Sequence, residues 1–374
     1  MILGDVCNVV MGQAPSGDSY NEDGNGMLLI AGASDLGELY PRPSRSTTSP
    51  GKISRPGDII LCIRATIGDK NWSDKEYCLG RGVAALRPKD AEQLAPQFLW
   101  HWVGANSSAL KSKGRGATFL QITRADIEEL PIVIPKIAEQ RRIAAILDKA
   151  DDIRRKRQEA LKLVDDLVKS QFIEMFGDPV TNPKGWKIGN IGLVGHVGGG
   201  YAFKSSEFVE EGVPIIRIGN IMNFRINLDD SVMCHRELLA KYQDYVCNKN
   251  DILMAMSGAT VGKPGIFMQD ETALINQRVA RIRVDDKICS PSFMFELIKS
   301  NYFQNQVQQL SAGCAQPNIS GKQIENIPCP VPPVPLQNEF AAFVEQADKS
   351  KFTMQRQLDE IETLSSALKQ EFFA

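Results

Sequence analysis

The sequence predicts an α+β protein in which two globular units alternate with two long helices, as an internal two-fold repeat. Three observations support this prediction. Residues 116–151 align with residues 313–348 without a gap, at an offset of 197. Short β-rich runs bounded by turn residues precede both segments, and a long pattern of helical period continues from both. Self-similarity at a fixed offset, with the elements in the same order, indicates a repeated unit.

The two segments align without a gap from Gly116 to Asp151, with identical residues spread along the alignment. Chance similarity is the alternative, and the preserved order of elements argues against it. Weaker similarity links three further pairs of segments, which are 56–68 with 249–262, 95–102 with 290–297, and 3–16 with 188–201. Identical residues in the main alignment occur at Gly116, Ile122, Ile127, Glu128, Pro131, Pro135, Gln140, Ala144, Ala145, Ala150 and Asp151.

The repeat divides the chain into four segments. A Gly/Pro/Asn stretch, "FGDPVTNPKGW" at 176–186, ends one helix and begins the second copy. A chain of 374 residues is also long for a single core, so more than one domain is expected. We predict globular units at 1–135 and 179–332, a central helix at 136–178 and a C-terminal helix at 333–374.

Each globular unit is expected to combine a sheet with a few packed helices. The predicted helices cover 96–105 and 292–310. The predicted strands are short runs rich in β-branched and aliphatic residues, at 27–32, 58–63, 213–219, 251–256 and 278–284.

The two long segments have a heptad pattern, with apolar residues spaced alternately by three and four. A helix of about 34 residues spans about 50 Å and would leave this stripe in water if it stood alone. Two such helices are expected to pair as an antiparallel coiled coil, with the globular units at opposite ends. The alternative is that each helix packs on its own unit as ordinary core. The predicted seam residues are Ile146, Ala150, Ile153, Ala160, Val164, Leu167, Met354, Leu358, Ile361 and Leu368.

The sequence contains no recognisable catalytic or metal-binding motif. "SGATVGKP" at 257–264 lacks the spacing of a phosphate-binding loop, and "GHVGGG" at 195–200 is not a dinucleotide fingerprint. The three histidines stand alone, and none of the eight cysteines forms a CxxC pair, which argues against zinc. We expect no catalytic residues and no metal site in this chain.

Composition indicates a cytoplasmic protein with reduced thiols. No apolar run reaches the 18–20 residues or so that a membrane helix needs, and no basic segment precedes an apolar run at the N-terminus. The formal net charge is −2, which excludes a uniformly basic protein but not a local basic surface.

Local basic surfaces occur on the predicted loops. The segment from residue 39 to 64 contains five basic residues and one acidic residue. The segment "LKSKGRGATF" at 110–119 contains three more basic residues and no acidic one. Lys and Arg neutralise phosphates, while Arg, Asn, Gln and Ser can read base edges. The candidate DNA-binding residues are Gln13, Ser16, Tyr20, Arg42, Arg45, Lys52, Arg64, Arg81, Lys111, Lys113 and Arg115 in the first unit, and Tyr201, Lys204, Ser205, Arg217, Asn220, Arg225, Lys263 and Arg278 in the second.

The two-copy layout resembles the specificity subunit of type I restriction–modification enzymes. The resemblance rests on "LPIVIPKIAEQRRIAAILDKADDIRRKR", its echo "IPCPVPPVPLQNEFAAFV" and "SQFIEMFGDP". It implies that each globular unit is a target recognition domain for double-stranded DNA. It also implies an asymmetric bipartite target with a gap of fixed length, read by a subunit that is not itself an enzyme.

The resemblance also implies partners. Two modification (methyltransferase) subunits and the restriction subunits would dock on this chain, and S-adenosylmethionine, ATP and Mg²⁺ would belong to them, with no cofactor in this chain. Three alternatives remain at this point. They are a coiled-coil scaffold or adaptor that binds only proteins, a single-chain restriction–modification enzyme, for which the chain has little room, and the specificity subunit of another methylation-based defence system.

Overall fold

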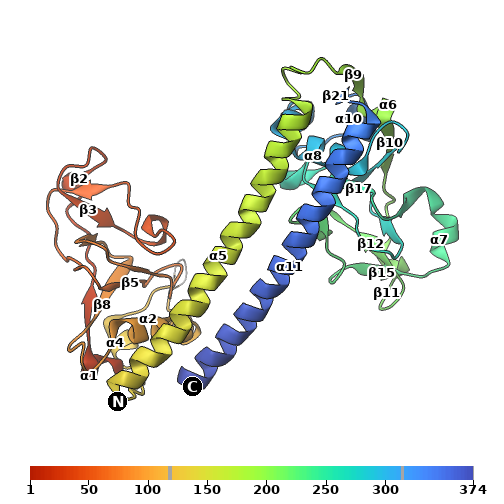
Figure 1. Ribbon diagram of the computed structural model, residues 1–374. Coiled ribbons are helices and arrows are strands. Elements are labelled where there is room, and N and C mark those ends of the chain that lie inside the picture. Colours follow the sequence, from red (N-terminus) through yellow and green to blue (C-terminus); the bar gives the residue numbers. More distant parts are fainter. Residues whose placement is uncertain (117–119, 313–315, 374) are drawn as a thin grey trace. The chain divides into compact units, whose positions relative to one another are not determined.

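The computed structural model describes residues 1–116, 120–312 and 316–373 (Figure 1). The chain forms two compact units, one made of Met1–Gln158 with Arg356–Ala374 and the other of Glu159–Gln355. Their boundaries differ from the predicted segments because each compact unit includes half of each long helix. None of the helices in the described part of the chain is long and apolar enough to cross a membrane.

The first unit contains two four-stranded sheets, in the orders β1-β8-β5-β6 and β2-β4-β3-β7. The first sheet is antiparallel throughout. Its strands are β1 (Cys7–Met11), β5 (Ile59–Cys62), β6 (Lys70–Trp72) and β8 (Val83–Pro88), and the second sheet has β2 (Tyr20–Asn21), β3 (Met27–Ile30), β4 (Ser46–Thr47) and β7 (Cys78–Leu79). The helices are α1 (Leu3–Val6), α2 (Pro96–Ala105), α3 (Ser107–Ser112) and α4 (Arg124–Glu128), with short 3-10 turns η1 (Gly17–Ser19) and η2 (Ala33–Asp35).

Strand β5 explains how this unit packs. All four of its residues are buried, as expected for a strand covered on both faces. Because side chains alternate between faces, Ile59 and Leu61 join the core under α2, while Ile60 and Cys62 join the core with the second sheet. The uninterrupted apolar run "IILC" therefore reflects burial on two sides.

The second unit repeats this plan with larger sheets, in the orders β10-β20-β17-β18-β14-β13 and β11-β15-β12-β19-β16, and a ribbon β21-β9. Its strands are β9 (Lys187–Asn190), β10 (Gly195–Gly199), β11 (Phe208–Val209), β12 (Val213–Ile216), β13 (Ile221–Met222), β14 (Arg225–Ile226), β15 (Val232–Cys234), β16 (Val246–Cys247), β17 (Ile252–Ala255), β18 (Pro264–Ile266), β19 (Ala273–Ile275), β20 (Val279–Val284) and β21 (Pro328–Val331). Its helices are α6 (Ile191–Val194), α7 (Leu238–Lys241), α8 (Pro291–Lys299), α9 (Asn301–Ser311) and α10 (Gly321–Glu325), with turns η3 (Ser205–Glu207), η4 (Ile218–Asn220), η5 (Gln243–Tyr245) and η6 (Gly258–Thr260).

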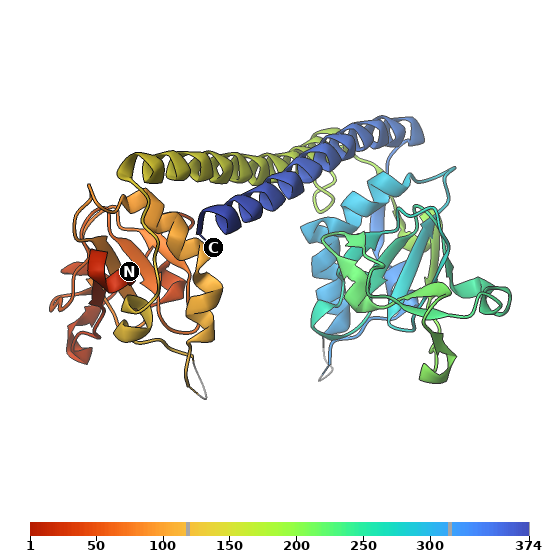
Figure 2. The same ribbon diagram turned by 90° about the horizontal axis from the view of Figure 1, so that it is seen from below.

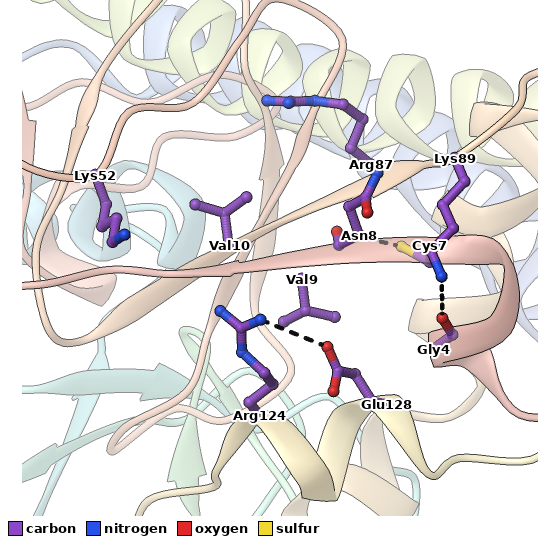
Figure 3. A pocket seen from close by; sticks show the side chains of 10 residues that line it. All are labelled: Gly4, Cys7, Asn8, Val9, Val10, Lys52, Arg87, Lys89, Arg124 and Glu128. Carbon is purple, nitrogen blue, oxygen red and sulfur yellow. Dashed lines mark hydrogen bonds and ion pairs between the residues drawn. The ribbon is translucent and has the colours of Figure 1, made fainter.

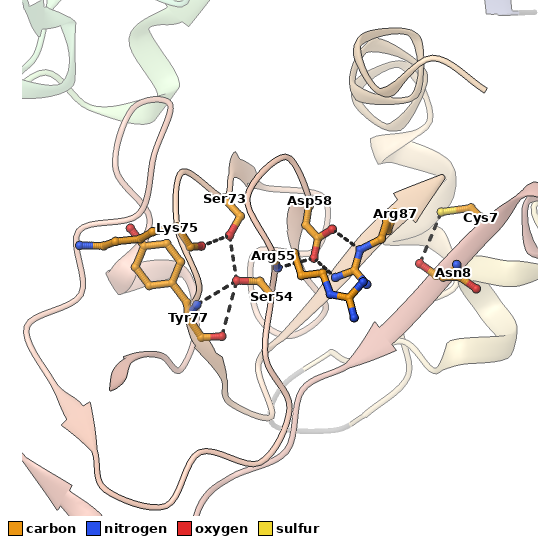
Figure 4. A network of polar contacts seen from close by, with 9 residues as sticks. All are labelled: Cys7, Asn8, Ser54, Arg55, Asp58, Ser73, Lys75, Tyr77 and Arg87. Carbon is orange, nitrogen blue, oxygen red and sulfur yellow. Dashed lines mark hydrogen bonds and ion pairs between the residues drawn. The ribbon is translucent and has the colours of Figure 1, made fainter. Parts of the chain in front are cut away.

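One buried ion pair recurs in both units. The Asp58 carboxylate, 1% exposed, accepts two hydrogen bonds of 2.6 Å from Arg87 and one of 2.8 Å from the Arg55 backbone N–H (Figure 4). In the second unit Asp251 accepts the corresponding bond of 2.7 Å from Arg283. The ion pair joins the turn before β5 to β8 in the first unit, and the turn before β17 to β20 in the second. The repeat therefore includes specific polar contacts as well as the apolar pattern.

The two long helices are α5 (Ile137–Phe176) and α11 (Val334–Phe373), each of 40 residues. A buried glutamine anchors the first turn of each helix. Gln140 accepts a bond of 2.9 Å from the Ala95 N–H and donates to two backbone carbonyls. Gln337 does the same with Ser290 and two carbonyls of its own unit. A fully bonded buried amide fixes the angle at which each helix leaves its unit.

The helices pair in antiparallel fashion (Figure 1, Figure 2). In the first unit the last turns of α11, with Leu368 and Phe372, pack on the core that holds the start of α5. In the second unit Phe172 and Phe176, near the end of α5, contact the Phe340 ring, near the start of α11, at centroid distances of 5.7 and 5.4 Å. The predicted antiparallel arrangement is therefore observed.

The alternative prediction also holds in part, because the start of each helix is core of its own globular unit. Ile143 and Leu147 of α5 belong to the core beneath α2. Phe340 and Ala347 of α11 belong to the corresponding core of the second unit. Each long helix thus packs on its own unit at its beginning and on the other long helix as well.

Two of the predicted seam positions are wrong. Ile153 and Leu167 are exposed at 37% and 52%. The buried stripe near the end of α5 instead runs through Val168, Phe172 and Phe176, at a spacing of four. A straight helix of 3.6 residues per turn drifts from a strict heptad, so a stripe extrapolated by threes and fours leaves the buried face. The other predicted seam residues, Ile146, Ala150, Ala160, Val164, Met354, Leu358, Ile361 and Leu368, are buried or half-buried.

A half-buried lysine, Lys70, lies where α2 meets the long helices in the first unit. The Lys70 ammonium lies 3.8 Å from the centroid of the Trp100 ring, which stacks on Trp72. Burial lowers the pKa of Lys70 to about 8, helped by the charge of Lys369 on α11. Nearby, the buried His101 shares a hydrogen bond of 2.7 Å with Asp148 of α5, and its pKa is lowered, chiefly by burial. His101 is therefore a packed residue of this junction.

Replacing Lys70 by methionine is expected to stabilise the protein by about 1 to 3 kcal/mol at pH 7, because the cost of burying a charge disappears. Below pH 8 the folded and unfolded chains both carry the proton, so the full cost applies. Between about pH 8 and 10.5 the folded chain loses the proton first, and the free energy of unfolding rises with pH. Urea denaturation at several pH values measures both effects. Lys75→Met, at an exposed lysine, is the control, and an equal gain there would contradict the explanation.

Candidate nucleic-acid interface

Three candidate residues of the first unit lie at one end of its first sheet, β1-β8-β5-β6. At this end β1 and β5 finish and β8 begins, and the adjoining loops carry Gln13, Arg64 and Arg81. Backbone hydrogen bonds hold these loops together, including 2.8 Å from the Gln13 N–H to the carbonyl of Leu79 and 2.9 Å from the Ile63 N–H to that of Gly82. We name this place the strand-end surface of the first unit.

The loop after α3 reaches the same surface. Arg115 and Gln121 exchange two backbone hydrogen bonds of 3.0 Å, and Gln121 also forms an isolated β-bridge with Arg64. The Arg115 side chain is 76% exposed, and its Nη2 atom donates to the buried Asp126 carboxylate at 3.1 Å. Asp126 keeps a lowered pKa, chiefly through its bond from the Thr123 backbone. Lys111 lies in the last turn of α3, and Lys113 caps that helix, directly before this loop.

Five other candidates lie elsewhere, on the second sheet of this unit and its loops. Tyr20 is in β2, Arg45 precedes β4, and Ser16 caps η1. Arg42 is held near η2 by a bond of 2.8 Å from its N–H to the carbonyl of Asp35. Lys52 lines a pocket of about 400 Å³ that opens beside β1 (Figure 3).

The pocket beside β1 contains three cations that the sequence analysis did not select, Arg87, Lys89 and Arg124. Each already has a partner. Arg87 is bound by Asp58, the Lys89 ammonium donates to the Gly4 carbonyl at 2.6 Å, and Arg124 lies 3.8 Å from Glu128. Lys52 forms no ion pair with the residues that the structure describes, so this pocket offers less unpaired charge than its composition suggests.

The second unit has the corresponding strand-end surface. Tyr201 follows β10, Arg278 precedes β20 and Lys263 precedes β18, all strands of one sheet. Arg217 follows β12 of the other sheet, whose last residue, Ile216, accepts a bond of 2.9 Å from the Asn276 N–H. The backbone bonds match those of the first unit, with 2.9 Å from the Tyr201 N–H to the carbonyl of Ile275 and 2.9 Å from the Met256 N–H to that of Arg278. Four candidates therefore meet here, as Gln13, Arg64, Arg81 and Arg115 do in the first unit.

Two candidates of the second unit have other roles. Asn220 is 7% exposed, and its amide bonds to the carbonyl of Asn227 and the hydroxyl of Ser231 while it accepts from the Arg217 N–H. It is a structural cap, so the prediction that it contacts DNA is wrong. Arg225 points to the long helix α11, where it lies 3.5 Å from Asp348.

The two remaining candidates, close in sequence to Tyr201, lie near η3. Lys204 and Ser205 are exposed at its start. Tyr201 is half-buried in an aromatic cluster, with its ring centroid 4.3 Å from that of Tyr242 and 5.1 Å from that of Phe203. Packing of this kind leaves Tyr201 fixed, with only part of its surface available to a ligand.

The strand-end surfaces suit contact with a polyanion and with base edges. Exposed guanidinium and ammonium groups can bind phosphates, and Arg and Gln can bind base edges. No group of three or more His, Cys, Asp or Glu residues that could hold a metal ion occurs within the described ranges. The seven cysteines in those ranges are free and buried, and Cys314 lies outside them.

Comparison with known proteins agrees with the internal repeat. A family model described as the type I restriction modification DNA specificity domain matches twice, at residues 1–163 and 183–363. The MjaVIII specificity subunit of Methanocaldococcus jannaschii, a type I restriction enzyme component, is 26% identical over 83% of this chain and 76% of its own length. The EcoBI specificity subunit of Escherichia coli is 23% identical over 91% of this chain and 77% of its own.

Another relative from M. jannaschii, named for the MjaX specificity subunit, is 33% identical over 41% of this chain, and the alignment spans 37% of that relative. A solved structure, the S subunit of a type I restriction–modification system from M. genitalium, covers all of this chain and 95% of its own with a TM-score of 0.66. At 15% identity this similarity shows the fold. The paired family matches show that the chain belongs to the type I restriction–modification specificity subunits, the non-catalytic subunits of those complexes.

Proposed function

We propose that each unit of this protein reads one half of a bipartite site in double-stranded DNA through its strand-end surface. The observation that supports this most is that exposed and half-buried cationic and polar side chains follow or precede corresponding strand ends in both repeats. Phosphate contacts would set the register of each unit on the duplex, and contacts to base edges would set the sequence. The major groove is the expected place, because every base pair presents a distinct pattern there.

The two half-sites should differ, because equivalent backbone positions carry different side chains. Gln13 of the first unit corresponds to Tyr201 of the second, since each follows the first strand of its sheet and bonds to the matching strand. Asp69 corresponds to Lys263, because their carbonyls accept bonds from the N–H groups of Cys62 and Ala255, the last residues of β5 and β17. Side chains of different charge and shape select different base pairs, so the target is asymmetric.

The long helices would set the length of the unread gap between the half-sites. Neither helix is interrupted along its 40 residues. Inserting one helical turn of four residues in both helices adds about 6 Å, which should lengthen the gap by one to two base pairs at roughly 3.4 Å each. Methylome sequencing of cells that carry the variant and its partners measures the gap. An unchanged gap would refute the proposal that the helices set its length.

The protein would act within a complex in the cytoplasm. Two modification subunits would dock on the repeats, and restriction subunits would join them. S-adenosylmethionine, ATP and Mg²⁺ would be bound by those partners, and this chain would contribute recognition and spacing only.

Methylome sequencing with the wild-type chain tests the proposal. The expected result is one asymmetric bipartite motif with a constant gap, present only when this chain is expressed with its modification subunit. If the assembled complex binds all duplexes equally, the chain is instead an adaptor that binds only proteins.

A further inference from the structure

One amide position is shared by the two strand-end surfaces. Gln121 and Asn318 are related by the same offset of 197 that aligns the repeats. Neither was among the candidates selected from composition, because each lies in a short linker outside the basic runs. Both side chains are exposed.

The backbone around these two residues is the same in both units. The N–H of the following isoleucine bonds to the central sheet, at 3.0 Å from Ile122 to the carbonyl of Ile63 in the first unit. The corresponding bond in the second unit, from Ile319 to the carbonyl of Met256, is 2.9 Å. Gln121 forms a β-bridge with Arg64, and Asn318 forms the matching bridge with Ser257.

The turn beside each bridge is also held in an unusual conformation. Ala65 and Gly258, each directly after the bridge partner, have φ of 58° and 81°. Their N–H groups bond at 3.0 Å to the carbonyls of Leu120 and Pro317, the residues before the two amides. Positive φ is costly for alanine and persists where the surrounding structure requires it. Each amide therefore projects from a rigid support.

Unused hydrogen-bonding capacity surrounds these amides. No hydrogen bond of the Gln121 or Asn318 side chain is recorded within the described parts of the chain. The hydroxyl of the bridge partner Ser257 is buried and also has no partner there. In the first unit the bridge partner, Arg64, is a half-buried cation at the edge of the surface.

We infer that Gln121 and Asn318 each read an adenine, one in each half-site, by pairing the side-chain amide with the N6 and N7 atoms in the major groove. Asn and Gln are the side chains whose donor and acceptor match that edge of adenine. The inference rests on the proposed DNA-reading function. It adds that the two otherwise different half-sites share one element, because this position carries an amide in both units while corresponding positions such as Gln13 and Tyr201 carry different side chains.

The test uses the full chain assembled with its modification subunits, on duplexes that carry the methylome-defined target. In further duplexes each A·T pair of the two half-sites is replaced singly by G·C. Gln121→Ala should lower affinity for the intact target about 5- to 150-fold and abolish discrimination at one A·T pair of one half-site. Asn318→Ala should do the same in the other half-site. Gln121→Arg should shift the preference at that pair toward G, and Gln121→Asn should retain adenine.

The outcomes separate this inference from the function on which it rests. Gln97→Ala, an exposed glutamine on α2, is the control and should change nothing. If Gln121→Ala weakens binding to every duplex equally, the residue contacts phosphate or supports the fold, and the inference is wrong. If the variants keep the full motif, the adenine inference is wrong, but the proposed DNA-reading function is unaffected. A wild-type complex with no sequence preference would refute both the adenine inference and the proposed function.

Discussion

Replacing Phe340 by alanine is expected to destabilise the second unit by about 3 to 5 kcal/mol, the usual cost of removing a fully buried phenylalanine. The ring is completely buried and contacts Phe172 and Phe176 of α5, and those two rings pack on Phe293 of α8. It therefore joins α11 to both α5 and the globular core. Urea denaturation of the full chain, followed by circular dichroism, measures the change.

Phe352→Ala on the same helix is the matched control, because that ring is 66% exposed. Its expected effect is within about 0.5 kcal/mol. Equal losses from the two variants would show that helix propensity, and not the buried contact between α5 and α11, determines stability. A loss at Phe340 alone supports the antiparallel pairing as the main support of this part of the chain.

Exchanging residues 1–130 for the corresponding segment of another specificity subunit is expected to change one half-site and leave the other intact. The strand-end surface of the first unit is built within this segment, and the long helices are left unchanged. Binding to the original target should fall to the non-specific level, a loss of about 1,000-fold or more. Methylome sequencing reads both half-sites and the gap together.

Exchange of residues 183–325 is the reciprocal control and should alter only the other half-site. A change in both half-sites after either exchange would refute the modular arrangement. A changed gap after either exchange would show that the globular segments contribute to the spacing as well as the helices.

The long helices illustrate how far periodicity predicts structure. The predicted segments at 136–178 and 333–374 contain the observed helices, because a long run of apolar residues at helical spacing, with proline only at its start (Pro335 in the first turn of α11), has few other solutions. Which apolar residues are buried was less predictable. Val168 is buried and its neighbour Leu167 is exposed, since the packing of the second unit selects the face.

The candidate surface shows a similar limit. The basic loops were recognised from composition, but the Asn220 amide is used within a turn, and the exposed Arg225 guanidinium lies 3.5 Å from Asp348 of α11. Whether a polar side chain is free for a ligand depends on hydrogen bonds to residues that the sequence does not place beside it. Gln121 lies outside the basic runs, and its β-bridge with Arg64, which places it at this surface, joins residues far apart in the chain.

The sequence by itself determined the duplicated plan, the β-rich units and the two long helices, since repetition and hydrophobic period are local properties of the chain. Only the tertiary structure decided which loops meet at the strand ends, which face of each helix is buried, and which charges remain unpaired. Those outcomes depend on contacts between residues distant in sequence, and many local patterns are compatible with several such sets of contacts.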